Sequence, residues 1–227
     1  MNVRHFESEE ELVRGVAEGI VRLVERGGKS IALSGGNTPK PIYKVLGGAL
    51  RDLLAQYDIV WVTGDERFVP PDDPQSNLKM IRESRFAEGM SPRHRLLEFR
   101  TTLGTPEECA ADFEQRWRDM QIERLDGCIL GVGEDGHTAS LFPATTALEV
   151  TDRIAVANYV PKFSAWRLTL TMPVIRNAAS RFVLAAGAGK KEILEKIAAG
   201  ERYPIVEATG GEGESWWFVD RAAMPEV

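Results

Sequence analysis

"SIALSGGNTPKPIYKVLGGALRDLLAQYDIVWV", residues 30–62, holds two short apolar runs separated by a glycine turn and a segment with helical periodicity. The two runs, 30–33 and 57–62, are typical of short buried strands. The segment between them predicts a helix with Thr38 as its cap and Pro39 in its first turn. Two strands joined by a helix need a crossover connection, which makes the strands parallel. This unit therefore predicts an α/β fold.

The same alternation continues on both sides of this unit. Before it, residues 8–28 place apolar side chains on one helical stripe, with Ser8 and Glu11 as a capping box, so we expect a helix as the first element. After it, the patterns predict helices at 76–86, 105–120 and 190–200, and strands at 127–132, 153–160, 166–171, 181–187 and 216–220. Strands separated by helices favour a mostly parallel sheet with helices on both faces. No linker-like composition divides the chain, so we expect a single domain, 1–227.

Composition narrows the possible partners. The chain has 227 residues, 43% of them hydrophobic, and a formal net charge of -6. An acidic surface disfavours nonspecific nucleic-acid binding, which needs cations to displace counterions from phosphates. No apolar run approaches the roughly 20 residues of a membrane span, and the N-terminus lacks the apolar core of a signal peptide. We therefore expect a cytoplasmic monomer without a nucleic-acid or membrane partner, in which Cys109 and Cys128 are packing residues because they lack CxxC spacing.

Ligands of open α/β sheets bind outside the carboxyl ends of the strands, so the segments after the predicted strands are the places to search. The strand at 30–33 is followed by "SGGNTP", residues 34–39. Glycines there allow backbone N–H groups to close around an anion, and the following helix N-terminus carries positive partial charge. The segment has the outline of a phosphate cradle. An ordinary strand-to-helix turn is the alternative.

Two other strand ends carry charged residues. The strand at 57–62 leads into "TGDERFVPPDDPQSN", where Asp65, Glu66 and Arg67 either face a cleft or form a solvated acidic loop. The strand at 181–187 leads to Lys190 and Lys191 at the start of a predicted helix. Cations in a first turn oppose the helix dipole, so we expect another interaction, such as a phosphate, to favour them there.

The fourth segment, "LGVGEDGHTASLFP", residues 130–143, follows the strand at 127–132. An imidazole can accept a proton from water at neutral pH, and a carboxylate beside it can fix its tautomer and stabilise the cation that forms. His137 and Asp135 are therefore a candidate base and the residue that orients it. The alternative is a structural or solvated histidine, which is the commoner role of a lone histidine.

Two other chemistries fit this segment poorly. A serine hydrolase needs a GxSxG nucleophile elbow, which the chain lacks. A metal centre needs further ligands beside His137, and neither His5 nor His94 follows a predicted strand. We expect no metal.

Six segments, in this order, resemble the 6-phosphogluconolactonase family: "LSGGNTP", "DERFVPPDDPQSN", "GVGEDGHTASLFP", "RLTLTMPVIRNA", "GAGKKEIL" and "WWFVDRAA". The resemblance covers nearly the whole chain, with Asn37 where the family commonly has serine. It implies a three-layer, Rossmann-like fold shared with glucosamine-6-phosphate deaminase and ribose-5-phosphate isomerase. It also implies hydrolysis of 6-phospho-D-glucono-1,5-lactone to 6-phosphogluconate, the second step of the oxidative pentose phosphate pathway, without a cofactor.

The resemblance implies roles for individual residues. His137 would activate water, Asp135 would orient it, and Arg67 would stabilise charge on the carbonyl oxygen or position the sugar. The residues implied to hold the 6-phosphate are Gly35, Gly36, Asn37, Thr38, Arg167 and Lys190. Further candidates for the substrate site are Ser34, Asp65, Glu66 and Gly136.

Two alternative functions share this fold. A sugar-phosphate isomerase or deaminase is similar in "GGxTP" and "DGH", but carries a glutamate at the position of Phe142. A sugar-phosphate sensor binds its ligand without turnover and usually loses the base, whereas this chain keeps His137.

Overall fold

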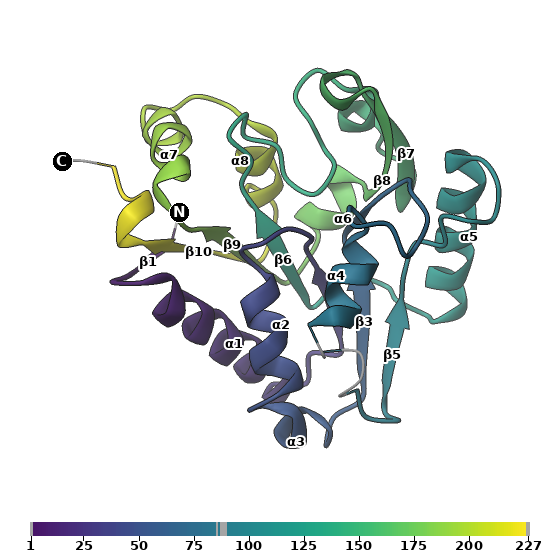
Figure 1. Ribbon diagram of the computed structural model, residues 1–227, viewed down its shortest axis with the longest axis horizontal. Helices are drawn as coiled ribbons and strands as arrows, with labels where there is room; N and C mark the ends of the chain where they lie inside the picture. The colour runs from purple at the N-terminus through teal and green to yellow at the C-terminus, as the bar shows by residue number, and fades with distance from the viewer. Residues whose placement is uncertain (1, 85, 87–89, 226–227) are drawn as a thin grey trace.

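The computed structural model describes residues 2–84, 86 and 90–225. Its centre is a seven-stranded parallel sheet with the strand order β1-β10-β9-β6-β2-β3-β5 (Figure 1). These strands are β1 (Asn2–Phe6), β2 (Ser30–Leu33), β3 (Ile59–Thr63), β5 (His94–Leu97), β6 (Gly127–Gly131), β9 (Ser180–Ala185) and β10 (Glu214–Asp220).

Helices cover both faces of this sheet. They are α1 (Glu9–Glu25), α2 (Lys40–Gly47), α3 (Arg51–Leu54), α4 (Asn77–Glu83), α5 (Pro106–Asp119), α6 (Met172–Arg176), α7 (Lys191–Ala198) and α8 (Pro204–Thr209). In Figure 1, α1 and α2 lie below the sheet, and α7 and α8 lie above it. No helix within the described part of the chain has the length and apolar character needed to cross a membrane.

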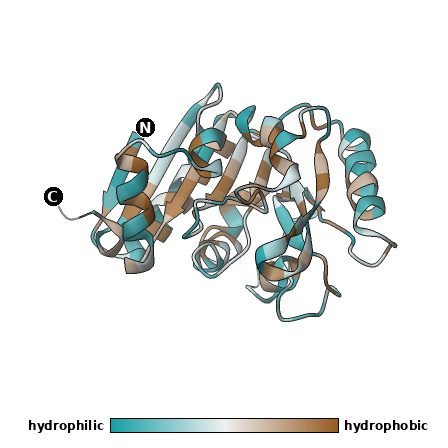
Figure 2. Cartoon of the chain, turned by 90° about the horizontal axis from the view of Figure 1, so that it is seen from above, coloured by the Kyte–Doolittle hydropathy of each residue, from teal (hydrophilic) through white to brown (hydrophobic). Residues whose placement is uncertain are grey.

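Alternation along the buried strands produces the three layers. In β2, Ile31 and Leu33 join the hydrophobic cluster that contains α1 and α2, whereas Ala32 joins the cluster on the opposite face. Trp61 and Val62 of β3 divide between the two clusters in the same way. A strand that is buried on both faces has no solvent-exposed side, so its sequence is an unbroken apolar run. Figure 2 shows these hydrophobic strands between helices with hydrophilic outer faces.

A second, three-stranded antiparallel sheet lies beside the first. It contains β4 (Asp65–Arg67), β8 (Ala165–Leu170) and β7 (Ala155–Val160), in the order β4-β8-β7. The strands predicted at 153–160 and 166–171 form the hairpin β7–β8 of this sheet. A short 3-10 helix, η2 (Pro161–Phe163), makes the tip of the hairpin.

The predicted mostly parallel sheet with helices on both faces is confirmed. The helix predicted at 105–120 is observed as α5, and it starts with a capping box formed by Thr105 and Glu108. The Ser8 side chain accepts a hydrogen bond from the Glu11 backbone as predicted, but the Glu11 carboxylate returns to the backbone N–H of Glu7.

Two details were predicted wrongly. The first element is β1, not a helix: its sequence NVRHF mixes polar and apolar residues because it is an edge strand, and its partner β10 is at the other end of the chain. Helix α2 has Pro39 at its N-cap and no side-chain cap, so Thr38 lies one residue outside that position. The helix predicted at 76–86 is observed as Asn77–Glu83, and Arg85 lies outside the described residues.

Candidate active site

A cavity of about 340 Å³ opens at the carboxyl ends of β2, β6 and β9. The segments after β2, β3 and β6 and the turn before α7 all contribute to its wall. The predicted site residues that line it are Ser34, Gly35, Gly36, Asn37, Thr38, Asp65, Arg67, His137 and Lys190. Asp135, Glu66, Gly136 and Arg167 are not among the lining residues. The fold thus gathers nine of the predicted residues around one space.

The loop between β2 and α2 forms one wall. Gly36 has a φ of +99°, a left-handed backbone conformation that favours glycine. The hydroxyl of Tyr43, one turn into α2, donates a hydrogen bond of 2.6 Å to the carbonyl oxygen of Ser34. Tyr43 is fully buried, and burial raises its pKa well above the ordinary value, so the phenol stays a donor. The loop is therefore tied to the helix that follows it.

His137 and Asp135 form a direct pair on another wall. The Nδ1 atom of His137 lies 2.5 Å from Oδ1 of Asp135. An ionised carboxylate accepts hydrogen bonds only, so Nδ1 carries the proton of this bond, and in the neutral ring Nε2 is the acceptor. Gly133 packs against the imidazole so closely that a Cβ there would overlap the ring. The turn after β6 therefore fixes both the tautomer and the place of the ring.

An aromatic ring supports the imidazole from one side. Phe142 stacks on His137 with ring centroids 4.0 Å apart and an angle of 22° between the planes. Phe163, at the tip of the β7–β8 hairpin, contacts Phe142 edge-on at 5.6 Å. In the sequence, Phe142 is distinctive only as the position of a glutamate in the deaminases. Its contact with His137 could not be read from a spacing of five residues in a loop.

A second charged group reaches Asp135. The Nζ atom of Lys162 lies 2.9 Å from Oδ2 of Asp135. Partial burial raises the pKa of Asp135, but the hydrogen bonds from Lys162 and His137 outweigh that effect and lower the pKa to about 2. Asp135 is therefore ionised at neutral pH, as the tautomer of His137 requires. Sequence reasoning did not identify Lys162.

Two arginines stand opposite each other beside the cavity. Arg67 of β4 and Arg167 of β8 are direct partners in the antiparallel register. Arg67 lines the cavity and donates to the backbone oxygen of Gln75 at 2.5 Å. Arg167 is buried, with its guanidinium 5.4 Å from the ring centre of Phe163. Burial and the nearby charge of Arg67 lower the pKa of Arg167. Within the described residues, neither arginine forms an ion pair with a carboxylate.

The neighbouring carboxylates of β4 have different surroundings. Glu66 is buried and accepts hydrogen bonds from the backbone N–H groups of Asn77 and Leu78 at 2.7 and 2.8 Å, so it caps the start of α4. Burial raises its pKa despite these bonds. Asp65 lines the cavity and accepts from the Ser140 hydroxyl at 2.7 Å and from the Asn77 side-chain amide at 3.1 Å.

Asn77 also lines the cavity, and it was missed as a site residue. Its only signal in the sequence was the "SN" that ends the "DERFVPPDDPQSN" segment. In the sequence, these two residues are equally typical of the start of a helix, and in the structure Ser76 is the N-cap of α4. The side-chain amide of Asn77 and the backbone of Gly35 lie so close that a Cβ on Gly35 would overlap it.

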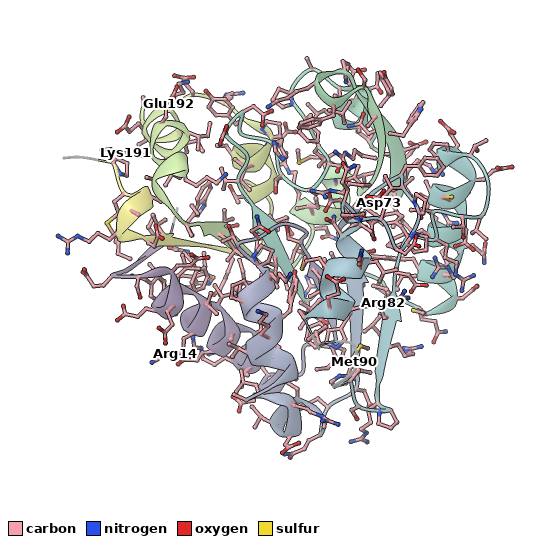
Figure 3. The ribbon with its side chains drawn as sticks, viewed as in Figure 1. Arg14, Asp73, Arg82, Met90, Lys191 and Glu192 are labelled. Atoms are coloured by element: carbon pink, nitrogen blue, oxygen red, sulfur yellow. The ribbon has the colours of Figure 1, made fainter. Side chains whose placement is uncertain are left out.

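The two lysines after β9 point to different places. Lys190 ends the 3-10 helix η3 (Ala188–Lys190) and lines the cavity. Lys191 begins α7 and is not a lining residue. Figure 3 shows Lys191 and Glu192 at the outer edge of the molecule. One cation of the predicted pair therefore faces the cavity.

The charged groups at this cavity suit an anionic ligand. Lys190 and Arg67 line the same cavity as the glycine loop after β2, on a protein of net charge -6. Within the described ranges, no group of three or more His, Cys, Asp or Glu side chains is placed to hold a metal ion. Cys109 and Cys128 are buried in the core, as predicted, and burial raises the pKa of Cys128 to about 12.

Comparison with known proteins gives consistent matches along the chain. A profile of the family described as "Glucosamine-6-phosphate isomerases/6-phosphogluconolactonase" matches residues 7–217. The 6-phosphogluconolactonase of Synechocystis sp. is 40% identical over 212 residues, which is 88% of this chain and 85% of that protein. That of Rhizobium meliloti is 32% identical over 224 residues, 94% of this chain and 90% of that protein.

The fold also matches solved structures. The structure of 6-phosphogluconolactonase from Trypanosoma brucei has a TM-score of 0.85 to this chain at 27% identity and covers 98% of this chain and 97% of its own. The enzyme from Trypanosoma cruzi has a TM-score of 0.86 at 26% identity, with 98% and 95% covered.

Proposed function

The chain belongs to the glucosamine-6-phosphate isomerase/6-phosphogluconolactonase family, and on that premise we propose that it hydrolyses 6-phospho-D-glucono-1,5-lactone to 6-phosphogluconate. This is the second step of the oxidative pentose phosphate pathway. The observation that carries the proposal is the contact of 2.5 Å between Asp135 and His137, which lines the same cavity as Lys190 and the glycine loop after β2.

The proposed reaction begins with water held by Nε2 of His137. Nε2 takes a proton from the water as its oxygen bonds to the lactone carbonyl carbon, and the carbonyl electrons move onto the carbonyl oxygen. Asp135 stabilises the imidazolium that forms. Arg67, the cation that lines the cavity from β4, supports the negative carbonyl oxygen. The bond from this carbon to the ring oxygen then breaks, and the imidazolium returns its proton to the ring oxygen, which becomes a hydroxyl.

The phosphate end of the substrate is proposed to bind across the cavity. Backbone N–H groups of residues 35–38 and the N-terminus of α2 supply donors, and Lys190 supplies a full charge. Arg167 does not line the cavity, so its proposed contact with the phosphate needs a movement of the guanidinium toward it. Imidazole, water and fixed charges supply the chemistry of an ester hydrolysis, so the proposed reaction uses no cofactor.

Phe142 disfavours the isomerase or deaminase alternative. The position that carries a glutamate in those enzymes holds an aromatic ring stacked on the imidazole. A proton shuttle through that position has no carboxylate to use. The sensor alternative is disfavoured by His137, whose pairing with Asp135 serves proton transfer and is unnecessary for binding a phosphate.

We propose that residues 1–227 act as one sugar-phosphate lactonase domain and that the enzyme works as a cytoplasmic monomer without a nucleic-acid or membrane partner. Its substrate is a phosphorylated sugar, which stays in the compartment where it is made. The acidic net charge of -6 supports the absence of a nucleic-acid partner.

The test is turnover of freshly generated lactone, with the uncatalysed hydrolysis subtracted at every substrate concentration. Purified protein should accelerate the reaction and release no ammonia from glucosamine 6-phosphate. A rate equal to the uncatalysed one would refute the lactonase proposal. Ammonia release would favour the deaminase.

A further inference from the structure

The tip of the β7–β8 hairpin contacts Asp135 and the aromatic ring that stacks on His137. Lys162 bonds directly to Asp135 at 2.9 Å. Phe163 packs edge-on against Phe142, which stacks on His137. The hairpin tip therefore contacts the carboxylate directly through the Lys162 ammonium, and it reaches the imidazole only through Phe142.

The hairpin tip has a defined conformation. Ser164 has a φ of +49°, and its backbone N–H donates to the carbonyl oxygen of Pro161 at 3.0 Å. The guanidinium of Arg167 and the ammonium of Lys162 lie 5.4 and 5.6 Å from the ring centre of Phe163. This turn sets the direction in which Lys162 leaves the hairpin.

The carboxylate of Asp135 is shared between two cationic or proton-donating groups. Its Oδ1 faces Nδ1 of His137, and its Oδ2 faces Nζ of Lys162. Because each oxygen has a hydrogen-bond partner, rotation of the carboxylate about the Cβ–Cγ bond would break both contacts at once. The ammonium also offsets part of the negative charge that would otherwise attract a proton to the imidazole.

Resting on the proposed function, we propose that Lys162 is a positioning residue for lactone hydrolysis. It holds the Asp135 carboxylate toward Nδ1 of His137, and its charge keeps the imidazole unprotonated to lower pH than Asp135 alone would allow. Lys162 is not itself a lining residue of the cavity, so it acts through Asp135 and not on the substrate.

Other charged groups face this part of the molecule from each neighbouring element. On the cavity side they are Asp65 and Arg67 from β4 and Lys190 from η3, and on the hairpin side Arg167 from β8. Glu134 is the exposed neighbour of Asp135 on the same turn. Within the described residues, Asp135 alone forms an ion pair with His137, and Lys162 is the lysine paired with Asp135. A change in the charge at position 162 therefore reaches the imidazole chiefly through that carboxylate.

The first experiment follows the imidazoles by NMR against pH, without substrate. The chain has three histidines, and the spectrum of His137→Gln identifies the signal of His137. In Lys162→Met and Lys162→Gln, the midpoint of the His137 titration should move to higher pH by about half a unit, the size expected of a partly exposed charge pair. Lys162→Arg should keep the wild-type midpoint.

The matched control removes another lysine–carboxylate pair. Lys196 bonds to Glu192 at 2.6 Å on the surface of α7, and neither residue lines the cavity. Lys196→Met should leave the His137 titration unchanged. An unchanged titration in both Lys162→Met and Lys162→Gln would overturn the proposal.

The second experiment measures lactone hydrolysis against pH for the same variants. In Lys162→Met, the acid limb of kcat/KM should move to higher pH together with the NMR midpoint. At neutral pH, kcat should fall by roughly three- to tenfold while KM changes by less than about twofold. A raised KM with an unmoved acid limb would make Lys162 a substrate ligand and overturn the positioning role. Wild-type protein without lactonase activity would refute the proposed function, and the NMR titration would still decide whether Lys162 acts on His137.

Discussion

The hydroxyl of Tyr43 donates a hydrogen bond of 2.6 Å to the carbonyl oxygen of Ser34, so that a side chain of α2 holds the loop that precedes the helix. Both groups are buried. Tyr43→Phe removes the donor and leaves the carbonyl oxygen without this partner. We expect the free energy of unfolding to fall by about 1–2 kcal/mol and KM to rise because the loop loses a restraint. Urea unfolding and initial rates measure the two effects. Tyr57→Phe, on a partly exposed tyrosine, is the control, and an unchanged KM in Tyr43→Phe would separate this bond from substrate binding.

Replacing His137, the proposed base, should act on turnover. His137→Ala should lower kcat by a factor of roughly 10² to 10⁴, the range of a positioned general base, with a smaller change in KM. The measurement is the initial rate with the uncatalysed rate subtracted. His5→Ala, on the exposed side chain of β1, is the control and should keep wild-type kcat. Near-normal kcat in His137→Ala would remove this residue from the mechanism.

Replacing the cavity lysine should act on binding. Lys190→Ala should raise KM by an amount equivalent to about 1.5–3 kcal/mol, because it removes the proposed charge-assisted hydrogen bond to phosphate. Inorganic phosphate should compete with the lactone in the wild type and compete less in this variant. Lys191→Ala is the neighbouring control, since Lys191 does not line the cavity. Equal KM values in both variants, with no competition by phosphate, would show that the loop after β2 is an ordinary turn.

The carboxylate of Asp135 should make the stability depend on pH in the acid range. The pKa of Asp135 is lowered from 3.8 to about 2 in the folded protein, where hydrogen bonds from Lys162 and His137 outweigh the effect of partial burial. A lowered pKa stabilises the fold above pH 3.8, and that contribution is lost as the pH falls toward 2. Urea midpoints measured across this range should therefore fall more steeply in the wild type than in Asp135→Asn. Asp52→Asn, on an exposed aspartate of α3, should keep the wild-type slope, and parallel curves for wild type and Asp135→Asn would contradict the prediction.

The strands that are buried on both faces were predictable because nothing polar interrupts them. Residues 30–33 and 127–131 show this clearly. The strand β4 was not predicted, since Asp65, Glu66 and Arg67 look like a charged loop. They form a strand because they pair with β8. In this pairing Asp65 lies opposite Thr169 and Arg67 lies opposite Arg167, a tertiary contact that the local sequence does not encode.

The candidate site was predictable as far as it lies at strand ends. Topology brings the carboxyl ends of parallel strands to one edge, so residues such as Gly35, His137 and Lys190 were found from their place after a strand. Lys162 was not, because it lies in an antiparallel hairpin and reaches Asp135 across 27 residues of sequence. Nothing in the sequence around Lys162 distinguishes it from any other exposed lysine.

The opposed arginines of β4 and β8 link the stability of the fold to the binding of an anion. Arg67 and Arg167 repel each other across the strand pair, and burial around Arg167 reduces the screening by water. A phosphorylated compound bound beside them offsets that repulsion and, by mass action, favours the folded chain over the unfolded one. Proteases that act on opened molecules then remove the enzyme more slowly when sugar phosphates are abundant.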